Sequence, residues 1–145
     1  MKSNRILLID DNPGDARLTQ EVLKESNLDK KLVIDIISDS EEAENFITNE
    51  LNSSSDRIPD IIILDLNLPK KNGIELLKLL KSTEHTKYIP VIIMTTSDAE
   101  FDLQSAYSNH ANAYIVKPPD FESLVKVMNS ISSFWFESVL LLSKI

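Results

Sequence analysis

The segment from Asp60 to Pro69, with the sequence DIIILDLNLP, constrains the fold of this chain more than any other. Its aliphatic run, Ile61 to Leu64, is rich in β-branched residues and predicts a strand buried on both faces, as in a parallel sheet. Asp65 ends the run, and Pro69 prevents further strand pairing. A carboxylate directly after a buried strand is costly unless its charge is needed or compensated. We therefore expect Asp65 at the carboxyl end of a central strand, where open α/β sheets bind their ligands.

Strand-like and helix-like segments alternate along the chain. This alternation predicts an α/β fold with a doubly wound parallel sheet and helices on both faces. For five strands we expect the common order 2-1-3-4-5, which right-handed crossovers favour. The expected strands cover residues 6–9, 32–37, 61–64, 91–94 and 113–116. The expected helices cover residues 13–26, begin at Ser40, run from Asn72-Gly73 to about Ser82, follow a cap at Ser97 or Asp98 as far as Tyr107, and begin after a cap at Asp120.

Composition limits the classes of protein to which the chain can belong. Its 145 residues contain no internal repeat or linker and predict one domain over residues 1–132, followed by an apolar extension over residues 133–145. The net charge of −8 argues against binding to nucleic acid or to anionic membranes. The absence of cysteine excludes disulfides and thiolate metal ligands. Because no stretch approaches the ~20 apolar residues of a membrane span, we expect a soluble, cytoplasmic protein.

The expected strand order brings polar residues together at one edge of the sheet. With strands 1 and 3 adjacent, Asp10 and Asp11 lie beside Asp65, while Thr95 follows strand 4 and Lys117 follows strand 5. Each has an ordinary explanation on its own. The acidic pair precedes Asn-Pro, as in a turn or helix cap, and a lone lysine is most often a solvated charge. Their coincidence at the ligand-binding edge favours a functional site over these separate explanations.

The residue types at this edge indicate a particular chemistry. Three neighbouring carboxylates repel one another, and a bound divalent cation removes the conflict. Oxygen ligands without histidine or cysteine select a hard cation such as Mg²⁺. Metal, ammonium and hydroxyl groups together suit phosphoryl transfer to a carboxylate. We therefore expect Asp65 to be the nucleophile, Asp10 and Asp11 to hold the metal, Lys117 to supply counter-charge and Thr95 to donate a hydrogen bond.

These residues also carry a family resemblance. The chain resembles the receiver domain of two-component response regulators over about residues 4–132. The resemblance implies that Asp65 accepts phosphate from a phosphohistidine on a sensor histidine kinase. It also implies that the chain is a switch, which catalyses only its own phosphorylation and dephosphorylation. The motifs that carry it are IDD at 9–11, LDLNLP at 64–69, Gly73, MTTS at 94–97 and YIVKP at 114–118.

The resemblance assigns a metal site to the acidic edge. It implies that Mg²⁺ or Mn²⁺ is bound by Asp11, Asp65 and the backbone carbonyl of Asn67. In the same resemblance Asp10 acts mainly through water. Asn67 therefore enters the expected site through its main chain rather than its side chain.

The resemblance also assigns a switch. It implies that Lys117 pairs with Asp65 or its phosphoryl group, and that the Lys117–Pro118 peptide bond is cis. Thr95 and Tyr114 look like the switch pair, in which the hydroxyl group moves to the phosphoryl group and the ring turns inward.

Three residues depart from the family pattern. Pro119 stands where an aromatic residue is usual, Asn72 replaces the commoner Asp, and Thr96 is larger than the usual Ala or Gly. Thr96 is therefore expected to slow phosphoryl access or loss. None of the departures removes a catalytic group.

Two alternative functions share this fold or chemistry. A metal-dependent phosphatase with an aspartyl intermediate usually carries a second Asp two residues after its nucleophile, and the corresponding residue here is Asn67. A phosphate-independent interaction protein on the same fold would normally have lost one of the acidic pair or the lysine. Asn67 counts against the phosphatase, and the presence of both acidic residues and the lysine counts against the interaction protein. The switch is therefore favoured over both alternatives.

The C-terminal extension, FWFESVLLLSKI at 134–145, allows two interpretations. Either the tail folds back over its own domain, or it forms a homodimer with Phe134 and Trp135 as anchors. The apolar spacing also predicts that the last helix runs beyond the edge of the domain, and such a helix needs burial on more than one side. The FW tail and the NPGDARL stretch at 12–18 resemble single-domain regulators that partner phytochrome-like sensor kinases. No basic recognition helix follows, which argues against DNA binding.

Overall fold

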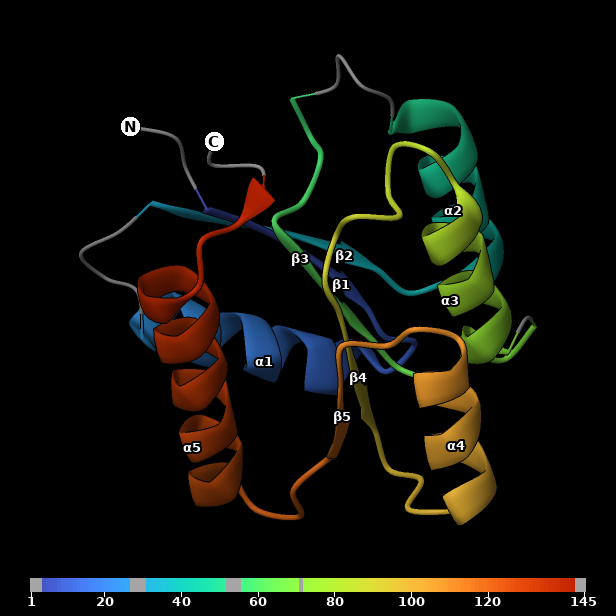
Figure 1. Cartoon of the computed structure of the whole chain (residues 1–145). Helices are drawn as coiled ribbons and strands as arrows, with labels where there is room; N and C mark the ends of the chain where they lie inside the picture. The colour runs from blue at the N-terminus through green and yellow to red at the C-terminus, as the bar shows by residue number, and fades with distance from the viewer. Residues whose placement is uncertain (1–3, 27–30, 52–55, 71, 143–145) are drawn as a thin grey trace.

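The computed structural model describes residues 4–26, 31–51, 56–70 and 72–142, and it forms a sheet between two layers of helices (Figure 1). The strands are β1 (Asn4–Ile9), β2 (Leu32–Ile37), β3 (Ile61–Leu64), β4 (Val91–Thr95) and β5 (Ala113–Val116). The helices are α1 (Pro13–Ser26), α2 (Ser40–Asn45), α3 (Gly73–Ser82), α4 (Glu100–Ser108) and α5 (Phe121–Ser132). Two π-helical segments, η1 (Phe46–Glu50) and η2 (Ser133–Ser138), continue α2 and α5.

All five strands are parallel, in the order β2-β1-β3-β4-β5, which confirms the expected topology. In the central pair, Ile9 lies opposite Leu64. The residues that follow them, Asp10 and Asp65, therefore leave the sheet side by side. The switch in winding direction occurs here, between β1 and β3, so these two residues lie at the point of the sheet where folds of this type bind their ligands.

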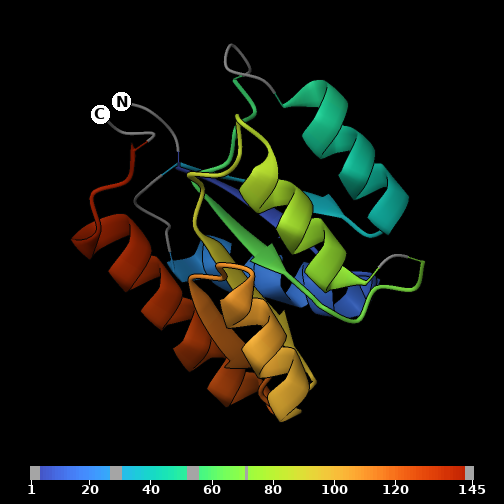
Figure 2. The same ribbon diagram turned by 45° about the vertical axis from the view of Figure 1, so that its right-hand side comes forward.

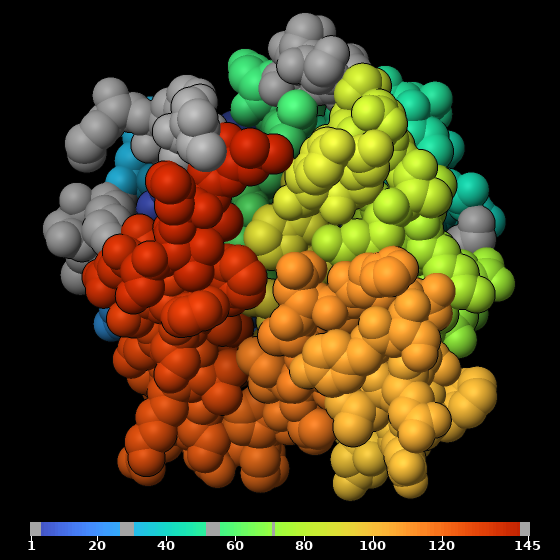
Figure 3. All heavy atoms as spheres, in the orientation of Figure 1, coloured from blue at the N-terminus to red at the C-terminus, as the bar shows by residue number. Residues whose placement is uncertain are grey.

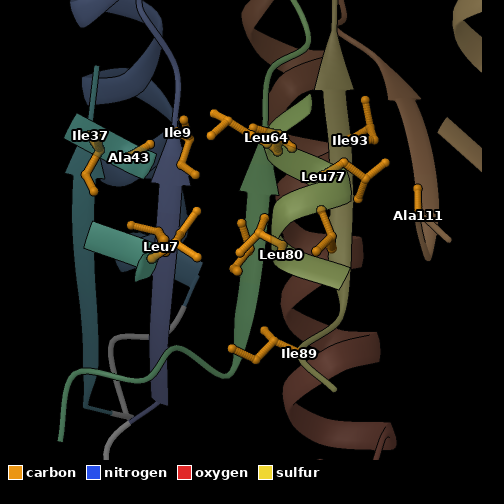
Figure 4. Close-up of a cluster of buried hydrophobic side chains, with 14 of the residues drawn as sticks. Leu7, Ile9, Ile37, Ala43, Leu64, Leu77, Leu80, Ile89, Ile93 and Ala111 are labelled. Carbon is orange, nitrogen blue, oxygen red and sulfur yellow. The ribbon is translucent and has the colours of Figure 1, made fainter. Parts of the chain in front are cut away.

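Each central strand is apolar on both faces because helices cover both faces. Helices α1 and α5 pack on one side, and α2, α3 and α4 pack on the other (Figures 1 and 2). Alternate residues of β3 point to the two sides, so Ile61 and Ile63 join one core cluster and Ile62 and Leu64 the other. Figure 4 shows the cluster under α2 and α3, where Leu77 and Leu80 meet Leu64.

Several element ends differ from their predicted positions. Strand β1 begins at Asn4 rather than Ile6, and β4 extends to Thr95. Helix α4 begins only at Glu100, so the predicted cap at Ser97 or Asp98 is wrong. The Ser97 side chain accepts a hydrogen bond from the Ala99 N–H at 3.3 Å, which keeps the chain in a turn for two more residues.

The C-terminal segment returns to its own domain. Helical backbone continues through η2 to Ser138, and the chain then turns. Leu141 is only 5% exposed and belongs to the cluster that α1 and α5 cover. This agrees with the folded-back interpretation of the tail, while residues 143–145 lie outside the described part of the chain. None of the helices described is both long and apolar enough to span a membrane.

Candidate functional site

The three predicted acidic residues meet at the carboxyl edge of the sheet. Oxygens of Asp10, Asp11 and Asp65 all lie within 4.8 Å of one another. Asp10 and Asp65 are 2% and 5% exposed, and Asp11 is the most accessible of the three. The Asp65 N–H donates to the Ile9 carbonyl at 2.9 Å, so the ladder between β1 and β3 sets the position of Asp65.

Lys117, at the end of β5, supplies the counter-charge. Its Nζ lies 2.9 Å from Asp10 Oδ2, 2.9 Å from Asp65 Oδ2 and 3.3 Å from Asp15 Oδ2. Burial alone lowers the pKa of Lys117, but the hydrogen bonds to Asp65 and Asp10 outweigh it, and the net pKa is raised. Lys117 therefore remains an ammonium ion at neutral pH.

Asp15 is a member of this cluster that sequence reasoning missed. It lies in the first turn of α1, which leaves the sheet directly after the acidic pair. A carboxylate in the first turn of a helix also fits the helix dipole, and that ordinary preference concealed its contact with Lys117. The available signal was its place in the first turn of the helix, because helical side chains tilt toward the amino end and so back toward the sheet edge.

Backbone groups fix the orientation of the two buried carboxylates. The Asn12 N–H donates to Asp10 Oδ1 at 3.0 Å, and the Asn67 N–H donates to Asp65 Oδ1 at 2.9 Å. Each carboxylate thus has one oxygen held by the main chain and the other by the ammonium group of Lys117. Burial raises the pKa of Asp10 in spite of these two hydrogen-bond donors, and the negative charge of Asp65 adds to the rise.

The donor set fits a hard divalent cation. One ammonium group cannot neutralise the carboxylates of Asp10, Asp11, Asp15 and Asp65. Asp11 makes no hydrogen bond or ion pair with any other residue in the described ranges, although two carboxylates lie close to it. Oxygen ligands without nitrogen or sulfur favour Mg²⁺ or Mn²⁺. The backbone carbonyl of Asn67 as a further ligand stays a prediction.

A glycine shapes the loop that carries Asn67. A Cβ atom on Gly73 would lie 2.5 Å from Leu66 Cα and 2.6 Å from the Asp65 carbonyl oxygen. Its N–H donates to the Leu66 carbonyl at 3.1 Å, which ties the first turn of α3 to the end of β3. Any larger residue at position 73 would therefore displace the backbone of the acceptor carboxylate.

The Thr95 hydroxyl group is fully buried and does not contact a carboxylate in this structure. Its Oγ1 accepts a hydrogen bond from Asn67 Nδ2 at 3.1 Å and a longer one from the Ser97 N–H at 3.4 Å. The same amide nitrogen donates to Thr96 Oγ1 at 3.1 Å. The predictions gave Asn67 only a main-chain role, so this side-chain bridge is new.

Tyr114 is connected to Thr95 through one residue. The Tyr114 hydroxyl donates to the Ser97 carbonyl at 2.9 Å, and its partly buried ring packs against the core cluster under α3 and α4. Burial raises the pKa of this hydroxyl. The Ser97 hydroxyl in turn donates to Asp102 of α4 at 2.5 Å. Thr95, Ser97 and Tyr114 thus form a chain of contacts that ends on α4.

One prediction at the site is wrong. No peptide bond among the described residues is cis, so the Lys117–Pro118 bond is trans. The trans form is the more stable isomer of an X–Pro bond by about 0.5–1 kcal/mol. The cis form is not needed for reach, because Lys117 already contacts both buried carboxylates and its N–H donates to the Thr95 carbonyl at 2.7 Å.

The predicted dimer anchors lie on another part of the molecule. Phe134 is 56% exposed, and its ring meets the Trp135 ring edge-on at 5.3 Å between centroids. Trp135 also packs against the cluster under α5. The two residues border a shallow groove of about 320 Å³, which Ile115, Lys126, Val127, Ser130 and Ile131 also line.

Comparisons with known proteins agree with this geometry. A family model described as "Response regulator receiver domain" matches residues 6–129. The response regulator Rcp1 of Synechocystis is 41% identical over 136 residues, which cover 94% of this chain and 91% of Rcp1. The probable methanogenesis regulatory protein FilR2 of Methanothrix harundinacea is 35% identical, over 90% of this chain and 82% of FilR2.

Solved structures show the same fold. The phosphorylated cyanobacterial phytochrome response regulator RcpA superimposes with a TM-score of 0.86 at 36% identity, over 97% of this chain and 99% of RcpA. The Mn²⁺-bound form of Rcp1 gives a TM-score of 0.84 at 41% identity, over 95% and 98% of the two chains. With five parallel strands, an acidic cluster and these relatives, this chain belongs to the response regulator receiver domain family.

Proposed function

We propose that this chain is a single-domain response regulator, in which Asp65 accepts a phosphoryl group from the phosphohistidine of a sensor histidine kinase. The observation that carries the proposal is the setting of Asp65. It is a buried carboxylate with one oxygen fixed by a backbone N–H and the other by Lys117, beside two further carboxylates. The group that is modified is the chain's own Asp65, so on this proposal the chain is a phosphoacceptor switch rather than an enzyme acting on other molecules.

The reaction exchanges one bond to phosphorus for another. An oxygen of Asp65 attacks the phosphorus atom, the new P–O bond forms, the P–N bond breaks, and its electron pair returns to the histidine ring. Lys117 Nζ already contacts Asp65 and would donate to the transferred oxygens, and the Thr95 hydroxyl at the end of β4 would turn to donate to them as well. Mg²⁺ or Mn²⁺, held by Asp10, Asp11, Asp65 and the Asn67 carbonyl, supplies further positive charge to these oxygens when bound.

Phosphorylation then shifts an existing equilibrium between two conformations. When the Thr95 hydroxyl turns to the phosphoryl group, it leaves its contact with Ser97, whose carbonyl holds Tyr114 and whose hydroxyl holds Asp102. The surface that changes is the face of α4, β5 and α5, where α4 and α5 are both exposed (Figure 3). A protein partner that reads this face is the expected recipient of the signal.

The proposed phosphodonor is a phytochrome-like sensor kinase in the cytoplasm. RcpA, a phytochrome response regulator, shares the fold over nearly the whole of both chains, and this supports the assignment. The net charge of −8 supports a protein partner rather than nucleic acid.

A homodimer is also part of the proposal, with Phe134 and Trp135 at its centre, because the tail packs back at Leu141 and leaves Phe134 on the surface. Phe134 is exposed beside the groove at α5, which suits a self-complementary aromatic contact. Sedimentation of the parent at tens of micromolar should give a dimer, and Phe134→Glu should give a monomer. Tyr88→Glu is the matched control, because Tyr88 is an aromatic residue 65% exposed between α3 and β4, away from η2. A monomeric parent would refute the dimer without affecting the phosphoacceptor role.

The phosphoacceptor role is tested by mass. Incubation with acetyl phosphate and Mg²⁺ should add one phosphoryl group, ~80 Da, to the parent. Asp65→Asn should take up none, and Asp60→Asn, which alters a buried carboxylate at the other end of β3, should be modified like the parent. A folded, Mg²⁺-binding parent that gains no mass would overturn the proposal in favour of a phosphate-independent interaction protein.

A further inference from the structure

The side-chain amide of Asn67 bridges two neighbouring threonines. Asn67 Nδ2 carries two hydrogens, and it lies 3.1 Å from Thr95 Oγ1 and 3.1 Å from Thr96 Oγ1. The bridge joins the loop after β3 to the end of β4. The backbone N–H of Asn67 also donates to Asp65 Oδ1, so the residue that carries the amide is anchored to the acceptor carboxylate.

The two anchors of the amide differ in their environment. Thr95 is fully buried, whereas Asn67 and Thr96 are exposed. Under the proposed function, on which this inference rests, the Thr95 hydroxyl turns to the phosphoryl group and weakens its contact with Asn67. Thr96 follows β4 on the solvent side, and the proposed function assigns it no movement. It is then the remaining side-chain anchor of the amide.

We propose that Thr96 is a positioning residue, which holds the Asn67 amide over phosphorylated Asp65 and so slows loss of the phosphoryl group. Loss by hydrolysis requires a water oxygen to attack phosphorus in line with the bond to Asp65. The new P–O bond forms as that bond breaks, the carboxylate leaves with the electron pair, and the water proton passes to solvent. An amide pinned at the solvent side narrows the approach of this water. Pinned through its nitrogen, it also cannot turn its Oδ1 to orient the water.

Two substitutions separate the hydroxyl group from the rest of the side chain. Thr96→Val has the same shape as threonine but cannot accept the hydrogen bond from Asn67. Thr96→Ser keeps the hydroxyl group and removes only a methyl group. If Thr96 acts by bulk, Thr96→Val will lose the phosphoryl group at the rate of the parent and Thr96→Ser will not. If Thr96 acts through its hydrogen bond, Thr96→Ser will match the parent and Thr96→Val will not.

The experiment measures phosphoryl loss from the full chain. Each protein is phosphorylated with acetyl phosphate and Mg²⁺, freed of the donor by rapid desalting, and followed by intact mass. Loss from Thr96→Val should be roughly threefold to tenfold faster than from the parent, the range that one neutral hydrogen bond spans. Thr96→Ser should stay within about twofold of the parent, because its hydrogen bond is retained. Unchanged or slower loss from Thr96→Val, or equal acceleration in both variants, would overturn the inference.

A second measurement does not depend on phosphorylation. Side-chain amide hydrogens of Asn67 should exchange with solvent more slowly in the parent and in Thr96→Ser than in Thr96→Val. Equal exchange in all three proteins would overturn the bridge. A parent that takes up no phosphoryl group would overturn the proposed function and the inference together. If the parent is phosphorylated but Thr96→Val loses its phosphoryl group at the same rate, the inference alone is overturned.

Discussion

Two buried carboxylates flank β3, and the protein compensates them in different ways. Asp60 and Asp65 are each 5% exposed. At the amino end, Asp60 Oδ2 accepts the Arg5 N–H at 2.7 Å, while the Asp60 N–H donates to the Arg5 carbonyl at 2.7 Å. At the carboxyl end, Asp65 Oδ1 likewise accepts a main-chain N–H, that of Asn67, but its other oxygen depends on the Lys117 side chain, which it shares with Asp10. A main-chain donor cannot leave its acid, but a lysine side chain can follow an added phosphoryl group.

The surroundings of the two acids also differ, because apolar side chains lie near Asp60 and further carboxylates lie near Asp65. The returning tail covers the region of Asp60, where Leu141 and Leu142 help to line a cavity of about 150 Å³. The carboxyl end gathers Asp10 and Asp11 around Asp65, and among the described residues a cluster of three metal-binding acids occurs only there. Burial of a carboxylate therefore does not by itself mark a reactive site. A reactive site is marked instead by several neighbouring carboxylates whose counter-charge comes from a side chain that can move, here Lys117.

The largest test of this contrast is Lys117→Met. Removing the ammonium group leaves two buried carboxylates without their counter-charge, and this should lower the free energy of unfolding by about 3–5 kcal/mol in EDTA at neutral pH. Urea denaturation measures the loss, and added Mg²⁺ should restore part of it. Lys78→Met, at an exposed position on α3, is the control and should be nearly neutral. A Lys117→Met protein as stable as the parent would show that the lysine is not the compensating charge.

The next test concerns the close packing at the reactive end of β3. A methyl group on Gly73 would meet the backbone of Leu66 and Asp65, so Gly73→Ala should cost about 1–3 kcal/mol of stability and slow phosphorylation. Gly14→Ala is the matched control, because its nearest contact would be Asn12 Oδ1 at 3.4 Å. It should be neutral or stabilising in the first turn of α1. Equal stability losses in thermal denaturation of the two variants would contradict the packing argument.

The stabilisation of the fold by Mg²⁺ should depend on the acids at the carboxyl end of β3 and not on Asp60 at its amino end. At ten times the dissociation constant, Mg²⁺ should stabilise the fold by about 1.4 kcal/mol, which corresponds to a rise in Tm of roughly 3–6 °C. Asp11→Asn should abolish most of this rise, since Asp11 is the cluster's carboxylate without a partner among the described residues. Asp60→Asn should retain it. Equal Mg²⁺ responses in thermal scans of both variants would place the ion elsewhere.

The smallest effects should have opposite signs at the two ends of β3. Asp60→Asn exchanges a charge-assisted hydrogen bond to Arg5 for a neutral one and should lose about 1 kcal/mol. Asp65→Asn relieves repulsion while Lys117 keeps Asp10 and Asp15, so metal-free stability should be unchanged or higher by up to about 1 kcal/mol. Urea titrations of both variants in EDTA provide the comparison. Equal losses would mean that the two acids are structurally equivalent.

The sequence contained most of the fold because strand and helix signals were local and alternated without interruption. The apolar run before Asp65 indicated a strand buried on both faces, and the strand order followed from general rules of chain winding. The acidic pair, Asp65, Thr95 and Lys117 could then be placed at one edge, because each directly follows a strand. The structure brings all of them to that edge.

Contacts that depend on side-chain direction could not be predicted in this way. The side-chain amide of Asn67 hydrogen-bonds to two threonines at the end of β4. Asp15, in α1, accepts a hydrogen bond from Lys117, which follows β5. The start of α4 was misplaced because Ser97 has the composition of a helix cap but is used in a turn. The isomer of the Lys117–Pro118 bond likewise depends on the folded loop rather than on its two residues.

The β1 strand starts at the end of the sheet opposite the acidic cluster, and the returning tail places Leu141 there too. A fluorescent label attached at Asn4 would accordingly lie a strand's length away from Asp65 and leave its approaches open. Labelling chemistry at that end could follow the reaction in real time without competing with it.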